Sequence, residues 1–140
     1  LDMSEIIKYW DGQQRVYHHT APINMMYALY QSLYDLIEEG VDNAIQRHYD
    51  AHIHLEKGLN DLGLKFLVDK GSRLPSLNAV KIPDGIDDLQ VRSKLLNDYL
   101  IEIGGGLGPF AGKVWRIGLM GHSARPENVN KLIDALKKIL

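Results

Sequence analysis

The sequence contains no cysteine among its 140 residues. A disulfide scaffold, a zinc ribbon and a thiol nucleophile are therefore all excluded. The sequence also has no large excess of one charge, since 16 basic and 18 acidic side chains leave a formal net charge of −2. Because nucleic-acid binders use surplus basic side chains to neutralise phosphates, this balance argues against a general nucleic-acid-binding function.

No hydrophobic run approaches the roughly 20 residues that are needed to cross a bilayer. The first five residues lack a basic region followed by an apolar one, so no secretory signal is visible and we do not expect a secreted protein. Because the chain starts at Leu1 and not at methionine, we expect it to be a piece of a longer protein. Residues 136–140 do not form a peroxisomal Ser-Lys-Leu signal, but with truncation expected, peroxisomal, mitochondrial and cytoplasmic locations all stay open.

Hydrophobic residues make up 45% of the chain and charged residues 24%, which is ordinary for a single globular domain. The spacing of apolar side chains predicts helices and short strands in a definite order. The helices are expected over residues 1–10, 23–37, 41–62, 87–99 and 126–140, and the strands over 64–68, 77–82, 100–103 and 114–120. This order predicts an α+β fold, in which N-terminal helices precede a small, mostly antiparallel sheet with helices packed over it. Residues 77–103 are a candidate βαβ crossover.

The glycine-rich segment from Gly104 to Lys113 has the appearance of a phosphate loop. A Walker A loop, however, needs a glycine where this chain has Leu107 and a serine or threonine where it has Val114. A strand, not a helix, is also expected to follow. We therefore expect a connection whose glycines adopt positive φ or let another group approach closely.

Three histidines occur within one predicted helix. His48 and His52 are four residues apart and share a face, whereas His54 points elsewhere. A zinc site needs three or four convergent ligands, so we expect a packed or surface pair and no metal site.

The tetrad of residues 17–20, Tyr-His-His-Thr, directly precedes a predicted helix N-terminus. Free backbone N–H groups favour an anion there, and the hydroxyl groups of Tyr17 and Thr20 could donate further hydrogen bonds to a phosphate. Alternatively, Thr20 only caps the helix and Tyr17 only packs. The residues themselves favour neither interpretation.

Arg116 lies in a predicted strand whose alternation places Val114, Arg116 and Gly118 on one face. A guanidinium inside an apolar strand needs a partner, because an unpaired buried charge is costly. That partner is either an internal acidic side chain or a ligand carboxylate, which suits the planar fork. The small Gly118 leaves room for a ligand and slightly favours the second interpretation.

Residues 17–22, 101–109 and 112–121 together resemble the C-terminal part of alanine–glyoxylate (serine–pyruvate) aminotransferases. These are class V, fold-type I enzymes that use pyridoxal phosphate. The resemblance runs along the whole chain and implies two parts. Residues 1–40 would be an interface loop and connecting helix, and residues 41–140 the C-terminal small α/β domain.

The resemblance also implies roles for individual residues. Tyr17 and Thr20 would reach the cofactor phosphate of the neighbouring subunit in a homodimer, and Arg116 would bind the α-carboxylate of the amino-acid or keto-acid substrate. His19 would be structural. The parent enzyme would move an amino group from alanine or serine to glyoxylate or pyruvate.

One part of the family pattern is missing. The lysine that holds the cofactor covalently lies upstream of the Tyr-His-His-Thr motif in the family, and only Lys8, in a different context, precedes Tyr17 here. We therefore expect no catalytic residue and no covalently bound cofactor in this chain, and no transamination by the chain in isolation. A missing large domain would supply the lysine.

Two alternatives remain open. The parent could be another class V enzyme, such as a 3-hydroxykynurenine transaminase or an amino-acid lyase; a desulfurase is disfavoured, since its mobile cysteine is absent. The chain could also be a non-enzymatic interaction domain. In either case we expect exposed apolar surface that promotes self-association.

Overall fold

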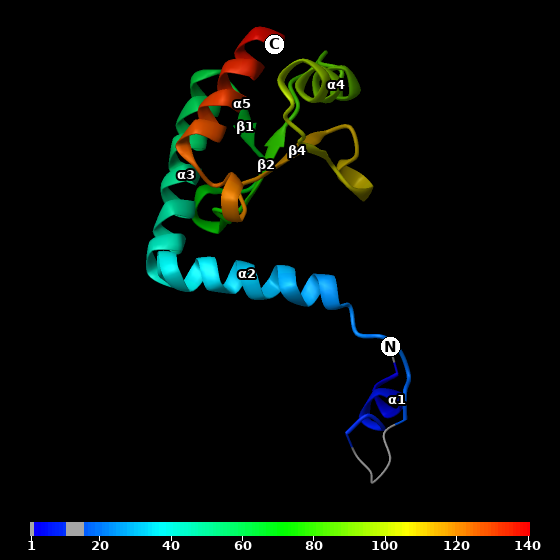
Figure 1. Cartoon of the computed structure of the whole chain (residues 1–140). Helices are drawn as coiled ribbons and strands as arrows, with labels where there is room; N and C mark the ends of the chain where they lie inside the picture. The colour runs from blue at the N-terminus through cyan, green and yellow to red at the C-terminus, as the bar shows by residue number, and fades with distance from the viewer. Residues whose placement is uncertain (1, 11–15) are drawn as a thin grey trace. The chain divides into compact units, whose positions relative to one another are not determined.

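The computed structural model describes residues 2–10 and 16–140, and the chain divides into two compact units, Leu1–Glu39 and Gly40–Leu140 (Figure 1). The first unit contains two helices, α1 (Met3–Ile7) and α2 (Ile23–Glu39). All the strands belong to the second unit. The expected interface role of residues 1–40 stays a prediction.

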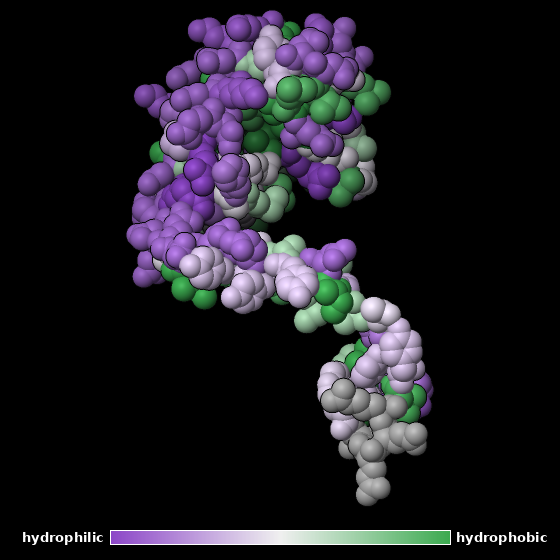
Figure 2. Space-filling view, in the orientation of Figure 1, coloured by the Kyte–Doolittle hydropathy of each residue, from purple (hydrophilic) through white to green (hydrophobic). Residues whose placement is uncertain are grey.

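Each helix of the first unit has a hydrogen bond to a residue just before its first turn. Asp2 caps α1 by accepting a hydrogen bond from the backbone N–H of Ser4 at 2.9 Å. α2 begins after Pro22, whose carbonyl accepts from the N–H of Met26 at 3.1 Å. None of the 17 residues of α2 is buried, and apolar and tyrosine side chains are spread along it (Figure 2). This helix therefore carries an apolar surface that its own unit does not cover.

The second unit has an α+β architecture, which confirms the predicted fold class. Its four-stranded sheet has the order β1-β2-β4-β3, and every neighbouring pair is antiparallel. Helices α3 and α5 run side by side in Figure 1. The elements are α3 (Val41–Asp61), β1 (Lys65–Phe66), β2 (Leu77–Lys81), α4 (Asp88–Tyr99), β3 (Gly104–Gly105), β4 (Val114–Gly118) and α5 (Pro126–Ile139), with short 3₁₀ turns at Lys70–Ser72, Gly108–Phe110 and Gly121–Ser123. Across the described residues, no helix is both long and apolar enough to span a membrane.

The strand predicted over residues 100–103 is wrong. Leu100 adopts the left-handed conformation, with φ of 56°, and its N–H caps α4 by bonding to the carbonyl of Leu96 at 3.2 Å. The N–H of Ile101 likewise bonds back to Leu95 at 3.0 Å. Because these groups complete the helix end, the ladder begins later, at Gly104–Gly105.

The candidate βαβ crossover is also modified. β2 and β3 are both antiparallel to β4 and so run in the same direction, but β4 lies between them. The connection through α4 therefore skips one strand position instead of joining neighbours.

Strand alternation separates the two faces of the sheet as predicted. Trp115, Ile117 and Leu119 are at most 3% exposed and lie on the face that the helices cover. The core around them comes from all three helices: Ala51, Leu55 and Leu59 of α3, Val91 and Leu95 of α4, and Val129, Leu132, Ala135 and Leu136 of α5. Arg116 points to the opposite face.

Two polar contacts hold α3 to β2 and to the segment before it. The buried imidazole of His52 lies 2.7 Å from the amide oxygen of Asn78, with Nδ1 as the donor. One turn further along, the buried Glu56 accepts a hydrogen bond from Arg73 at 2.6 Å. These pairs satisfy polar groups that would otherwise be costly to bury.

The contact between α3 and α5 predicts an unusual cost for a helix-favouring substitution. A Cβ at Gly58 would lie 2.0 Å from Cδ1 of Ile133, so Gly58→Ala forces the two helices apart or Ile133 into another rotamer. We expect a loss of about 1–3 kcal/mol in the free energy of unfolding, measured by urea titration. Gly71→Ala, where a Cβ meets nothing within 4 Å, should be close to neutral. Equal stability of both variants would contradict this packing.

Candidate functional site

Arg116 projects from the face of the sheet opposite the core helices α3, α4 and α5. Its ladder neighbours are Gly104 on β3 and Ala79 on β2, so both flanking side chains are small. The guanidinium lies over Gly104, where a Cβ would be only 3.2 Å from Nη2. A larger residue at position 104 would press against this group.

One side of the Arg116 guanidinium is held by the protein. Its Nε donates a hydrogen bond to the carbonyl of Gly105 at 2.7 Å. Within the described part of the chain, Arg116 forms no ion pair, and its Nη groups make no hydrogen bond. The internal acidic partner that the sequence left possible is thus not seen among these residues, and the outer edge of the fork can accept a carboxylate.

A cavity of about 200 Å³ adjoins Arg116. Its wall comes from β2 and from the segment between β1 and β2, and most of it is apolar. The lining residues are Phe66, Val68, Ser72, Arg73, Leu74, Leu77, Asn78, Ala79 and Arg116. The size and lining suit a small organic acid.

On the opposite face of the sheet, α4 supplies an ion pair that the sequence interpretation missed. Asp88 accepts two hydrogen bonds from Arg92, at 2.8 and 3.0 Å, and one from the indole N–H of Trp115 at 3.0 Å. The hydrogen bond from Arg92 lowers the pKa of the Asp88 carboxyl, partial burial opposes this, and the charge of Arg92 adds to the lowering. The same pairing raises the pKa of Arg92. The i, i+4 spacing of the two charges was the available signal.

The hydroxyl groups of Tyr17 and Thr20 meet in the first unit, where they are hydrogen-bonded to each other. Thr20 lies three residues before α2. Its described side-chain hydrogen bond is with Tyr17 and not with a backbone N–H of α2, so it does not show the capping role considered from the sequence. Tyr17 is 71% exposed. The hydroxyl of Tyr9 donates to the carbonyl of His19 at 2.5 Å, which ties the segment just after α1 to this turn. Arg116 belongs to the other unit.

The glycine-rich segment serves close packing, as the sequence predicted. A Cβ at Gly106 would be 1.9 Å from the carbonyl oxygen of Phe110, and Gly108 and Gly112 have positive φ, at 53° and 70°. Gly104 and Gly105 make room for arginine side chains instead of a phosphate.

The predicted histidine pair is used in packing. His48 lies 2.6 Å from the carbonyl of Ala44 through Nδ1 and accepts from the N–H of Gly121 through Nε2 at 3.0 Å. His54 instead bonds to Asn130 at 2.6 Å. Among the residues that the structure describes, no three histidine or acidic side chains gather as metal ligands.

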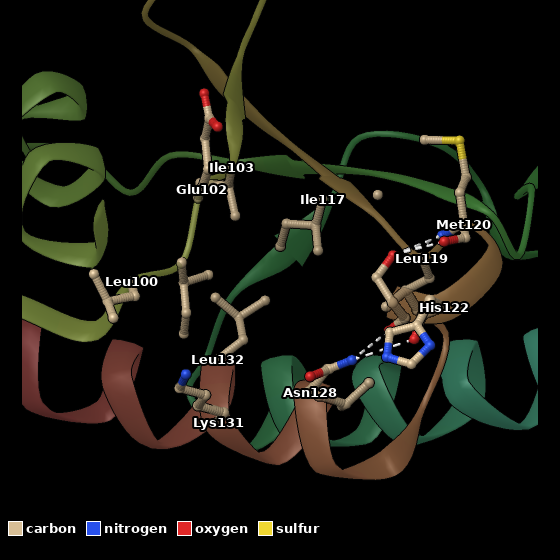
Figure 3. A pocket seen from close by; sticks show the side chains of 14 residues that line it. Leu100, Glu102, Ile103, Ile117, Leu119, Met120, His122, Asn128, Lys131 and Leu132 are labelled. Atoms are coloured by element: carbon tan, nitrogen blue, oxygen red, sulfur yellow. Dashed lines mark hydrogen bonds between the residues drawn. The ribbon is translucent and has the colours of Figure 1, made fainter. Parts of the chain in front are cut away.

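A second cleft, of about 490 Å³, opens between residues 100–103, the end of β4 and α5. Figure 3 shows Ile103, Ile117 and Leu132 pointing into it, whereas the carboxylate of Glu102 points away. The amide of Asn128 bonds to backbone carbonyls of the 3₁₀ turn at 3.4 Å. Hydrophobic side chains form most of the wall of this cleft. The smaller cavity beside Arg116 is therefore the better candidate for binding a charged ligand.

Comparison with known proteins extends these observations. No family model matches the chain. Alanine–glyoxylate aminotransferase of Mus musculus is 42% identical over 142 residues, covering 99% of this chain and 34% of the mouse protein. (S)-Ureidoglycine–glyoxylate transaminase of Bacillus subtilis (strain 168) is 39% identical over 140 residues, covering all of this chain and 33% of that protein. The crystal structure of an alanine–glyoxylate aminotransferase from Nostoc sp. matches with a TM-score of 0.88 at 51% identity, over 99% of this chain and 36% of that one.

The fold and these similarities define the class: the chain corresponds to the C-terminal small domain of fold-type I, class V pyridoxal-phosphate aminotransferases. Within that class, the chain belongs to the aminotransferase family that includes the alanine–glyoxylate enzymes. The resemblance noted from the motifs is thereby confirmed. The chain spans about a third of the length of the curated relatives that it matches.

The pairing of Asp88 predicts a pH dependence of stability. A carboxyl whose pKa is lower in the folded state contributes stability that is fully present above its ordinary pKa, ~3.9, and is lost as the pH falls through the lower folded value. We expect the free energy of unfolding to fall as the pH drops below about 5, and to fall less in Asp88→Asn, which starts lower at neutral pH. Urea titrations of both proteins across this range measure the difference. If both proteins lost the same free energy of unfolding over this pH range, Asp88 would not be the source of the pH dependence.

Proposed function

We propose that this chain is the small domain of a pyridoxal-phosphate-dependent aminotransferase that moves an amino group from alanine or serine to glyoxylate or pyruvate. The observation that carries the proposal is the guanidinium of Arg116, anchored at Nε and open at both Nη groups beside a small cavity. The named relatives support the acceptor: the mouse and Bacillus subtilis enzymes differ in amino donor and share glyoxylate.

Arg116 binds the α-carboxylate of either substrate. A planar fork donates two parallel N–H hydrogen bonds to the two oxygens of a carboxylate and fixes its orientation. An amino acid and a keto acid carry the same carboxylate, so one arginine serves the donor and the acceptor in turn. The small neighbours Gly104 and Ala79 leave space for this group.

The residues of the first unit suit a phosphate group. Tyr17 and Thr20 present two neutral hydroxyl donors side by side, and Tyr17 is largely exposed. In the proposed homodimer they donate hydrogen bonds to the phosphate oxygens of the cofactor held by the neighbouring subunit. The bound cofactor supplies the electron withdrawal at the reacting carbon.

The proposed enzyme needs a large domain that this sequence does not contain. That domain carries the lysine that holds the cofactor, and it covers the apolar surface of α2 together with the partner subunit. The chain by itself is then inactive, because it binds the carboxylate without supplying the covalent centre.

A chimera tests the role of Arg116. This chain replaces the matching part of the Nostoc enzyme, to which it is 51% identical. We expect the chimera to transaminate alanine with glyoxylate, and Arg116→Lys to lower kcat/KM by roughly tenfold to a few hundredfold, because the lost charge-assisted hydrogen bonding is worth about 1.5–3 kcal/mol.

Two controls accompany that assay. Arg125→Lys changes an exposed arginine before α5 and should retain full efficiency. The 140-residue chain, incubated with pyridoxal phosphate, should give no turnover. Full efficiency of Arg116→Lys would exclude the carboxylate-binding role, and turnover by the chain in isolation would exclude a covalent centre located elsewhere.

The same chimera tests the phosphate contact. Tyr17→Phe removes one hydroxyl donor and keeps the ring, so the dissociation constant of pyridoxal phosphate should rise about tenfold or more, as expected for a hydrogen bond to a charged group. Equilibrium dialysis of the cofactor measures it. Tyr49→Phe on α3 serves as the control, and an unchanged constant in Tyr17→Phe would contradict the contact.

A further inference from the structure

Two arginines lie on opposite faces of the two-residue strand β3. A Cβ at Gly104 would be 3.2 Å from the guanidinium of Arg116, and a Cβ at Gly105 would be 3.4 Å from that of Arg92. Neighbouring strand residues face opposite sides of a sheet, so the backbone of β3 separates the two charges. The guanidinium of Arg92 thus lies over the position that a side chain at Gly105 would occupy, and the Gly105 carbonyl accepts the hydrogen bond from Nε of Arg116.

Arg92 is held in place by a carboxylate one helical turn earlier. Asp88 accepts from Nε of Arg92 at 2.8 Å and from Nη2 at 3.0 Å, a two-point contact that fixes the plane of the guanidinium. The side chains of Asp88 and Arg92 are 16% and 28% exposed, so solvent weakens this pair less than a surface ion pair.

The same carboxylate also binds strand β4. Nε1 of Trp115 donates to Asp88 at 3.0 Å, and Trp115 is fully buried and paired with Gly105 in the β3–β4 ladder. Asp88 therefore joins α4 to β4 through Trp115, and it holds Arg92 over the open side of Gly105 in β3.

We propose that Asp88 is a positioning residue for the guanidinium of Arg116, acting through Arg92 and Gly105. β3 is an edge strand that pairs with β4 through two residues only, so the backbone around the Gly105 carbonyl is held by a short ladder. That carbonyl sets the orientation of Arg116 through Nε. A fork oriented before the ligand arrives loses less side-chain freedom on binding. Only the consequence for substrate binding rests on the proposed function.

The first experiment follows the Nε–H proton of Arg116 in the 140-residue chain by ¹⁵N-edited NMR. Arg116→Lys identifies the resonance by removing it. We expect Asp88→Asn to speed exchange of this proton with water by roughly tenfold, because the accepting carbonyl is no longer fixed. Arg92→Lys, which loses the two-point contact, should do the same and supplies the test where Asp88→Asn does not fold.

The matched control changes the neighbouring aspartate. Asp87 caps α4 by accepting from the N–H of Gln90 at 3.0 Å and has no described contact with Arg92 or Trp115. Asp87→Asn should destabilise the helix end and leave the Arg116 proton unchanged. The proposal is overturned by unchanged exchange in folded Asp88→Asn and Arg92→Lys, or by an equal acceleration in Asp87→Asn.

The second experiment measures the consequence in the chimera. Asp88→Asn should raise the KM for glyoxylate several-fold with kcat nearly unchanged, since a loosened fork weakens ground-state and transition-state binding alike. A faster proton exchange without a change in KM would retain the structural coupling and reject the carboxylate role of Arg116. An unchanged KM together with unchanged exchange would reject the positioning role itself.

Discussion

The short ladder between β3 and β4 is the constraint on which the candidate site depends. Two glycines on β3 lie opposite Arg116 and Trp115, and each leaves space for one guanidinium. A side chain at either glycine would push an arginine away from the sheet. The ladder therefore needs residues without side chains at the point where a charged group must lie flat on the strand.

This ladder also explains how the domain tolerates an arginine in a central strand. β4 carries Trp115 and Ile117 into the core on one side and Arg116 on the other. The main core cluster on the other face is completed by α3, α4 and α5. On the Arg116 face Val114 is buried, whereas the ladder neighbours of Arg116 itself are the small residues Gly104 and Ala79.

The sequence predicted this division but not its details. Strand alternation over residues 115–119 correctly separates the core face from the face that carries Arg116, because alternation depends only on local geometry. The strand expected at 100–103 failed because Leu100 and Ile101 give their N–H groups to the end of α4, a competition that an apolar run does not reveal. Local pattern is reliable where one hydrogen-bonding scheme is available and fails where two compete.

The partner of Arg116 could not be predicted for a different reason. Whether an internal acid reaches it depends on side chains from β2, β3 and the segment before β2, which are up to about fifty positions away in sequence. The network of Asp88 was missed in the same way, since the i, i+4 pair is visible in sequence but its contact with Trp115 is tertiary.

The Nε and the Nη groups of the Arg116 guanidinium have different requirements: Nε needs a fixed partner, and the Nη groups need to stay accessible to a ligand. Nε must be held so that the fork has one direction, and a backbone carbonyl can do this without neutralising the charge. Under the proposed function, a carboxylate in the same place would compete with the carboxylate of the substrate. The acidic group that orders this region, Asp88, lies instead on the other face, where its charge is matched by Arg92. Keeping the acid behind the strand lets the domain fix Arg116 while leaving its charge available to a ligand.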